Sequence, residues 1–134
     1  MKRFLAITLC ALLVVSCFSL ASAEAPKRKV FFTNAVYTAP FCSPLNAQAM
    51  KTAEENNIEL TIVDGQADAS VQLDQIKTAI DQGYDGIIYF PADAEGSISI
   101  VKALNESGIA YAIIDSKVDA SVAETIPVFA GPDN

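Results

Sequence analysis

Short apolar runs, rich in β-branched and aromatic residues, alternate with longer segments of helical period along most of this chain. The apolar runs begin at Val30, Ile58, Gly86 and Ile109, and each interval leaves room for one helix that crosses back over a sheet. Strands connected in this way are parallel, and right-handed crossovers place helices on both faces of the sheet. The sequence therefore predicts an α/β fold with a parallel sheet of about five strands.

Residues that commonly begin and end helices lie between these runs. We expect strands over residues 30–33, 58–63, 86–90, 109–114 and 127–130. The predicted helix starts are Ser43 with Pro44, then Asp68 or Ser70, then Asp93, and the predicted ends are Asn56 with Asn57, Gly83 and Gly108. In sheets of this kind ligands bind outside the carboxyl ends of the strands, so we expect the site in the loops that follow them.

The end of the predicted fifth strand leaves part of the sheet without an expected cover. Residues 131–134 follow that strand directly, where the next covering helix is expected to begin. An exposed sheet face there would leave apolar core residues in contact with water. We therefore expect either that the sequence is a truncated piece of a longer protein or that a partner supplies the cover.

The first 23 residues have the features of a secretory signal peptide. Lys2 and Arg3 precede an almost entirely apolar stretch over residues 4–20, and residues 21–23 form the small-residue pattern of a cleavage site. Serines interrupt the apolar run, which favours a cleaved peptide over a retained membrane anchor. We expect a periplasmic protein or, since residues 14–17 resemble a lipobox, a lipoprotein anchored through Cys17.

Composition indicates that the rest of the chain, residues 24–134, is one acidic domain. The formal net charge of the sequence is −7, and removal of the leader takes away Lys2 and Arg3 but no acid. Nucleic-acid binding depends on basic side chains that neutralise phosphates, so it is disfavoured. Roughly 110 residues suffice for one domain with its own core. Cys42 is the one cysteine in this range, so packing rather than an internal disulfide must stabilise the domain.

Several kinds of chemistry lack the residues that they need. The sequence contains no histidine, the commonest general base and the commonest zinc ligand. The loop after the first predicted strand has no glycine, so it is neither a dinucleotide fingerprint nor a P-loop. Cys42 follows that strand, but the arginine that a phosphatase nucleophile needs is absent, and a buried apolar role fits it better. The sequence therefore predicts neither a cofactor nor a metal.

Three aspartates follow predicted strands and leave a secreted α/β enzyme as an alternative. Asp64, Asp93 and Asp115 could form a carboxylate cluster for acid–base work. A helix cap for Asp93 and a turn for Asp64 are the simpler interpretations. Asp115 differs because no evident helix start follows it, so we expect its carboxylate to project into the crevice. A carboxylate there can accept hydrogen bonds from two adjacent hydroxyl groups of a polyol.

Aromatic residues are predicted near the same strand ends. Tyr37 and Phe41 follow the first strand, and Phe90 ends the third. Their rings offer flat apolar faces for a sugar ring. Ordinary core packing is the alternative for each of them, most of all for Phe90, since alternating residues at a strand end point away from the crevice.

Several short motifs follow one another with a characteristic spacing. They are Ala39-Pro40-Phe41, Asp64-Gly65-Gln66-Ala67-Asp68, Gly83-Tyr84-Asp85-Gly86-Ile87-Ile88, Pro91-Ala92-Asp93, Asp115 and Gly131-Pro132-Asp133-Asn134. In their order and spacing, residues 30–134 resemble the N-terminal lobe of periplasmic sugar-binding proteins of the ribose/galactose type, the solute receptors of ABC importers. The resemblance implies a sheet in flavodoxin-like strand order and two lobes that close on a ligand like a hinge.

The resemblance also implies that Phe41 stacks on the ligand and that Asp115 binds its hydroxyl groups. Taken with the analysis above, we predict a ligand site of Tyr37, Phe41, Phe90, Asp115 and Asp133, with no catalytic residue. The family often has polar or aromatic residues where this sequence has Ala39, Cys42, Phe90 and Ser116. These departures indicate a ligand with fewer hydroxyl groups than ribose, or with a different shape.

We therefore expect a solute-binding protein, not an enzyme, that captures a sugar or similar small polar ligand for an ABC permease or a chemoreceptor. Contact with the membrane is expected only through that transporter, unless Cys17 is lipidated. A sequence of this length is expected to lack the second lobe and so to hold half a site. A non-functional fragment without a stable fold is the remaining alternative.

Overall fold

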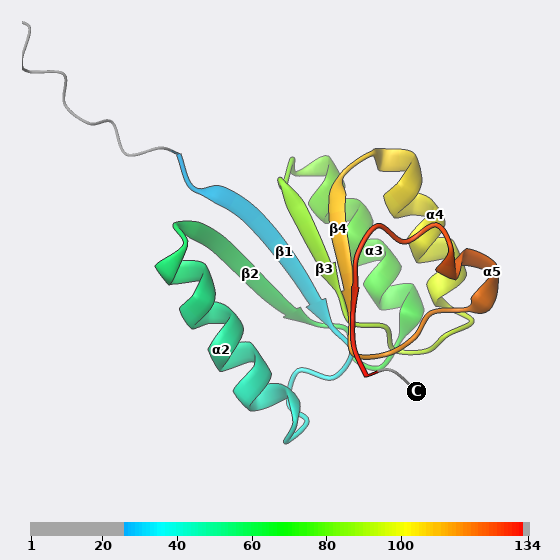
Figure 1. Cartoon of the computed structure of the whole chain (residues 1–134), viewed down its shortest axis with the longest axis horizontal. Helices are drawn as coiled ribbons and strands as arrows, with labels where there is room; N and C mark the ends of the chain where they lie inside the picture. The colour runs from blue at the N-terminus through cyan, green and yellow to red at the C-terminus, as the bar shows by residue number, and fades with distance from the viewer. Residues whose placement is uncertain (1–25, 133–134) are drawn as a thin grey trace, which may run out of the picture.

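The computed structural model describes residues 26–132 and confirms an α/β fold built on one parallel sheet (Figure 1). The predicted signal peptide (residues 1–23), Cys17 and Asp133 lie outside the described residues. The elements are β1 Arg28–Asn34, α2 Cys42–Glu55, β2 Ile58–Asp64, α3 Ala69–Asp81, β3 Gly86–Tyr89, α4 Ser97–Ser107, β4 Ala110–Ile114, α5 Ala120–Ala123 and β5 Phe129–Ala130.

The five strands lie in the order β2-β1-β3-β4-β5, and every neighbouring pair is parallel. This is the predicted flavodoxin-like order. Because the strands are parallel, their carboxyl ends lie at one edge of the sheet, toward which the arrowheads of Figure 1 point. We call the loops at this edge the strand-end rim: residues 35–41, 65–68, 90–96, 115–119 and 131–132.

Helices cover the two faces of the sheet unequally. α3, α4 and α5 lie on one face, and α2 lies alone on the other (Figure 1). The strand order explains this, since the right-handed crossover from β1 to β2 runs in the opposite direction from all later ones. The larger core, beneath α3 to α5, includes Phe31, Ile76, Ile87, Tyr89, Ile100, Val101, Leu104 and Ile113. The buried residues of the smaller core, beneath α2, are Phe32, Ala35, Cys42 and Phe90.

Beyond α2, the same face of the sheet is partly open. Ile88 and Ile114 pack against the smaller core but are only half-buried, and Ala110 at the start of β4 is exposed. Among residues 26–132, the other helices lie on the opposite face (Figure 1). Within the described residues, this part of the sheet therefore has no covering helix.

Two helix starts differ from the prediction. α2 begins at Cys42, so Ser43 lies inside the helix, and the first amides are satisfied by the backbone: the Cys42 and Ser43 N–H groups both donate to Ala39 O (2.9 and 3.2 Å). α4 begins at Ser97 because the Asp93 carboxylate accepts from the Gly96 N–H (2.6 Å) and makes a turn before the helix. Asp93 is therefore not the cap of α4.

Other boundaries are confirmed. Asp68 caps α3 by accepting hydrogen bonds from the Ser70 and Val71 N–H groups (2.7 and 3.3 Å). Gly83 and Gly108 follow α3 and α4 with φ of 72° and 70°, which glycine adopts without strain. The four-residue α5 was not predicted, because a single turn is too short for helical periodicity to show.

Two tyrosines of the larger core differ in hydrogen bonding. The Tyr111 hydroxyl donates to Asn105 Oδ1 (2.8 Å), whereas the fully buried Tyr89 hydroxyl has no partner among the described residues. Burial raises the pKa of both hydroxyls, and the charge of Asp93 adds to the rise for Tyr89. Tyr89 therefore stays protonated at neutral pH as an unpaired buried donor, which costs free energy.

We expect Tyr89→Phe to raise the free energy of unfolding by about 1 kcal/mol, because it removes an unpaired buried hydroxyl and keeps the ring. The matched variant Tyr111→Phe breaks a hydrogen bond and is expected to lower that free energy by about 1 kcal/mol. Urea denaturation followed by circular dichroism measures both. An equal loss in the two variants would show that the Tyr89 hydroxyl is hydrogen-bonded.

Candidate functional site

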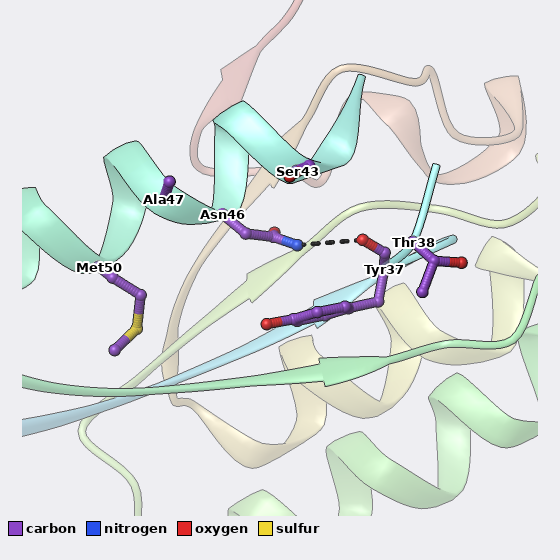
Figure 2. A pocket seen from close by; sticks show the side chains of 6 residues that line it. All are labelled: Tyr37, Thr38, Ser43, Asn46, Ala47 and Met50. Atoms are coloured by element: carbon purple, nitrogen blue, oxygen red, sulfur yellow. Dashed lines mark hydrogen bonds between the residues drawn. The ribbon is translucent and has the colours of Figure 1, made fainter. Parts of the chain in front are cut away.

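Two buried asparagines hold the first loop of the rim. Asn34, the last residue of β1, donates from Nδ2 to Asn46 Oδ1 on α2 (2.8 Å). Asn46 in turn donates from Nδ2 to Tyr37 O (3.3 Å), the bond drawn in Figure 2. Asn34 Oδ1 accepts from the Val36 N–H (3.2 Å). The loop is therefore tied to both β1 and α2 by bonds that are largely shielded from water.

The second loop of the rim is bonded to the first. The Gly65 N–H donates to Asn34 O (2.6 Å), and the Tyr37 N–H donates to Asp64 Oδ1 (3.1 Å). A Cβ on Gly65 would lie 2.8 Å from Asn34 O, so this close approach requires glycine. Asp64 also accepts from the Gln66 N–H (2.9 Å), so it serves as the turn residue that the sequence offered as its simpler role.

Three rim residues other than glycine have a left-handed backbone. Gln66 and Ala67 have φ of 55° and 53°, in a turn closed by a bond from the Asp68 N–H to Gly65 O (3.0 Å). Asp115 has φ of 63°, and the Ser116 N–H donates across it to Ile114 O (2.8 Å). Such conformations cost of order 1–3 kcal/mol each and concentrate at functional sites. Their position at the rim supports a functional role for this edge.

Phe41 and Asp115 both lie on the rim, although 74 positions in the sequence separate them. Phe41 precedes α2, and its side chain is 58% exposed. Asp115 follows β4, and its N–H donates to Ala130 O of β5 (2.9 Å), which fixes its backbone. Its side chain is half-buried, and Oδ2 accepts from Ser116 Oγ (3.3 Å). The rim therefore combines an exposed aromatic ring with a partly shielded carboxylate.

The other predicted site residues are placed differently. Tyr37 is 41% exposed, and its ring lies beside α2 (Figure 2). It lines a hollow of about 430 Å³ together with Thr38, Ser43, Asn46, Ala47 and Met50. Phe90 is only 8% exposed and belongs to the smaller core, which is the packing that the sequence offered as its alternative. A ligand contact for Tyr37 or Phe90 stays a prediction, and Asp133 lies outside the described residues.

Three of the groups considered for an enzyme, Cys42, Asp64 and Asp93, have structural roles. Cys42 is buried as a free thiol in the smaller core, in agreement with the apolar role predicted for it. Across residues 26–132, no three His, Cys, Asp or Glu side chains are arranged to hold a metal ion. In the same range, every helix is too short or too polar to cross a membrane.

The sequence analysis did not identify the buried polar residues whose hydrogen bonds hold the rim loops in place. Asn46 and Gln72 are buried on α2 and α3, on the sides that pack against the sheet. A polar residue on the apolar stripe of an amphipathic helix is a usable signal, because a buried amide needs hydrogen-bond partners. Asn34 carried no such signal, since an asparagine at the end of a strand is common in turns.

A family model described as the periplasmic binding protein domain matches residues 30–134. Because the match covers most of the chain, the protein belongs to this family. The family consists of solute-binding proteins rather than enzymes, and membership implies an extracytoplasmic location.

Individual relatives agree with this assignment. The chain is 29% identical over 87 residues to the ribose import binding protein RbsB of Bacillus subtilis (strain 168), a match that covers 65% of this chain and 28% of that protein. A galactofuranose binding protein of solved structure superposes with a TM-score of 0.73 at 23% identity, covering 79% of this chain and 36% of its own. The Caulobacter myo-inositol binding protein bound to myo-inositol superposes with a TM-score of 0.73 at 19% identity, covering 84% of this chain and 38% of its own.

The two structural matches show the fold alone, because their sequence identities are low. The chain spans 28 to 38% of the length of these three relatives. It therefore corresponds to one part of a longer molecule in each of them.

We expect Asn46→Ala to lower the free energy of unfolding by about 2 kcal/mol, because it leaves the Asn34 amide buried with a missing partner. Gln48→Ala, two positions away on the exposed side of α2, is the control and is expected to change it by less than about 0.5 kcal/mol. Urea denaturation compares the two. A loss no larger than that of the control would contradict the role of the Asn34–Asn46 pair.

Proposed function

We propose that this protein is an extracytoplasmic solute-binding protein that captures a sugar or similar small polar ligand at the strand-end rim. It delivers that ligand to an ABC-type importer or a chemoreceptor. The observation that carries the proposal is the placement of Phe41 and Asp115 on one edge of a parallel sheet, the edge where such folds bind ligands.

The two side chains suit the two kinds of surface that a sugar presents. The exposed ring of Phe41 offers an apolar face to the C–H groups of a sugar ring. The Asp115 carboxylate has two oxygens and can accept hydrogen bonds from adjacent hydroxyl groups. Its partial burial strengthens those bonds, because water competes for them less than at an exposed site.

The rim supplies only one wall of such a site. Small-molecule pockets commonly bury about 70–90% of the ligand surface, whereas Phe41 is 58% exposed and Tyr37 41% exposed here. We infer that residues 24–134 form the N-terminal lobe and that a second lobe closes over the ligand as a hinged partner. The length of the relatives supports this inference, since this chain spans 28 to 38% of them.

Three of the positions where the family often has polar or aromatic residues offer few free polar groups to a ligand. Cys42 and Phe90 are buried in the smaller core, and the Ser116 hydroxyl is engaged by Asp115. These observations support a ligand with fewer hydroxyl groups than ribose or with a different shape. Polar contacts from this lobe are expected to centre on Asp115 and, outside the described residues, on Asp133.

The route to the outside of the cytoplasm forms part of the same proposal. Lys2 and Arg3, the apolar stretch that follows and the small residues before position 24 support cleavage of a signal peptide and release into the periplasm. Anchoring through a lipidated Cys17 is the alternative route, and it would hold the lobe at the membrane surface.

Isothermal titration of a two-lobed form of the protein against D-ribose, D-galactose, L-arabinose, myo-inositol and adenosine tests the proposal. We expect one member to bind, and Asp115→Asn to weaken its binding at least about tenfold, because a hydrogen bond to a charged group is lost. Phe41→Ala is expected to weaken binding by a similar factor, and Phe41→Tyr to retain it, since stacking needs only the ring.

Asp81→Asn is the matched control. It removes the same charge from the end of α3, at the edge of the sheet opposite the rim, and should leave the affinity unchanged. The absence of heat with every member of the panel would overturn the proposal. Equal weakening by Asp81→Asn and Asp115→Asn would instead show that overall charge, and not the rim carboxylate, governs binding.

A further inference from the structure

Gln72 is a polar residue on the buried side of α3. Its side chain is completely buried, and the other buried residues of that helix, Ile76 and Ala79, are apolar members of the larger core. Burial of an amide without partners would cost several kcal/mol, so its hydrogen bonds explain why the position tolerates a glutamine.

Gln72 makes three hydrogen bonds, and together they fix the orientation of its amide. Nε2 donates to Phe90 O (2.8 Å) and to Thr33 Oγ1 (3.3 Å). Oε1 accepts from the Ala92 N–H (2.9 Å). A reversed amide would place an oxygen against Phe90 O and a donor against the Ala92 N–H, so only one orientation is compatible with these contacts.

Phe90 O and the Ala92 N–H lie on the two sides of Pro91, just after β3 ends. Proline has no N–H, so the chain cannot continue the ladder of the sheet through this residue. The segment that leaves β3 is therefore held at its first turn by a side chain from α3.

The same side chain is also connected to the ends of β1 and β2 and to the second rim loop. The Thr33 hydroxyl, which accepts from Gln72, donates to Gln75 Oε1 (2.7 Å), and Gln75 Nε2 donates to Asp64 O at the end of β2 (2.7 Å). A Cβ on Gly65 would lie 2.7 Å from the Gln72 side chain, so the second rim loop closes tightly over it. Gln72 therefore connects the segment that follows β3 to the ends of β1 and β2, and it packs against Gly65 of the second rim loop.

We propose that Gln72 is the positioning residue of the ligand-binding rim: it holds the segment over residues 90–96 in a fixed place relative to the ends of β1 and β2 and to the second rim loop. The role rests on the proposed solute-binding function. If a lobe closes on a ligand as a rigid body, its binding surface must already have the right conformation before the ligand binds. Buried hydrogen bonds behind the ligand-contacting residues provide such preorganisation. Gln72 contacts no solute itself and acts through the backbone of Phe90 and Ala92.

The test is amide hydrogen exchange, resolved by nuclear magnetic resonance, on the whole chain without ligand. Gln72→Met keeps the size of the side chain and removes its three bonds. We expect the protection of the Ala92 N–H to fall about tenfold, because its acceptor is lost. The Ile113 N–H, which donates to Val128 O in the sheet (3.0 Å), should change less than about twofold.

Gln72→Glu provides a second variant with a pH dependence. When ionised, the glutamate cannot donate to Phe90 O; when protonated, it regains one donor. Burial raises the pKa of such a carboxyl above its unfolded value of about 4.3, so the variant should be close to wild type near or below that value. The defect at Ala92 should then grow as the pH rises through the raised pKa toward 7. Gln48→Glu, exposed on α2, adds the same charge and should show no defect.

Equal loss of protection at Ala92 and Ile113 would overturn the proposal, because a general loss of stability lowers the protection of both amides. No loss at Ala92 would overturn it as well, because Gln72 would then have no effect on that segment. A defect of Gln72→Glu that does not change with pH would count against it as well. These readouts need no ligand. A selective loss at Ala92 in a protein that binds no solute would keep Gln72 as the residue that fixes the segment and would overturn the ligand-binding function alone.

Discussion

Each crossover helix in this protein returns the chain to the amino edge of the sheet, so every strand runs in the same direction and ends at the same edge. Residues far apart in sequence are brought to one rim by this constraint alone. Phe41 follows β1 and Asp115 follows β4, yet both belong to the strand-end rim. The site, the strained turns and the buried amides all depend on that shared edge.

The same handedness decides how the sheet is covered. A chain that moves from β1 to β2 and then returns past β1 to β3 must place its first crossover helix on one face and the later ones on the other. α2 therefore covers its face alone, and Ile88 and Ile114 remain half-buried beyond it. The matched part of the Bacillus subtilis relative is 28% of that protein's length.

Sequence patterns predicted the elements well where periodicity or caps were strong. The Asp68 cap of α3 and the stop at Gly108 were foreseeable, because each follows from local chemistry. The strand order was foreseeable only from the family resemblance. The start of α4 was not foreseeable, because an aspartate carboxylate can accept hydrogen bonds either in a turn or at the start of a helix. In the structure, Asp93 accepts from the Gly96 N–H and forms a turn before the helix. Phe90 was ambiguous for a similar reason, because the face that it points to depends on the end of β3.

The sequence by itself determined the fold class, the common edge and the candidates Phe41 and Asp115, because alternating strand and helix periods and right-handed connections leave few arrangements. Only the tertiary structure decided which polar groups meet. Asn34 with Asn46, and Gln72 with the backbone around Pro91, are pairs from different elements. Their partners are chosen by where buried donors and acceptors come within hydrogen-bond distance, and that proximity exists only after the helices have packed on the sheet.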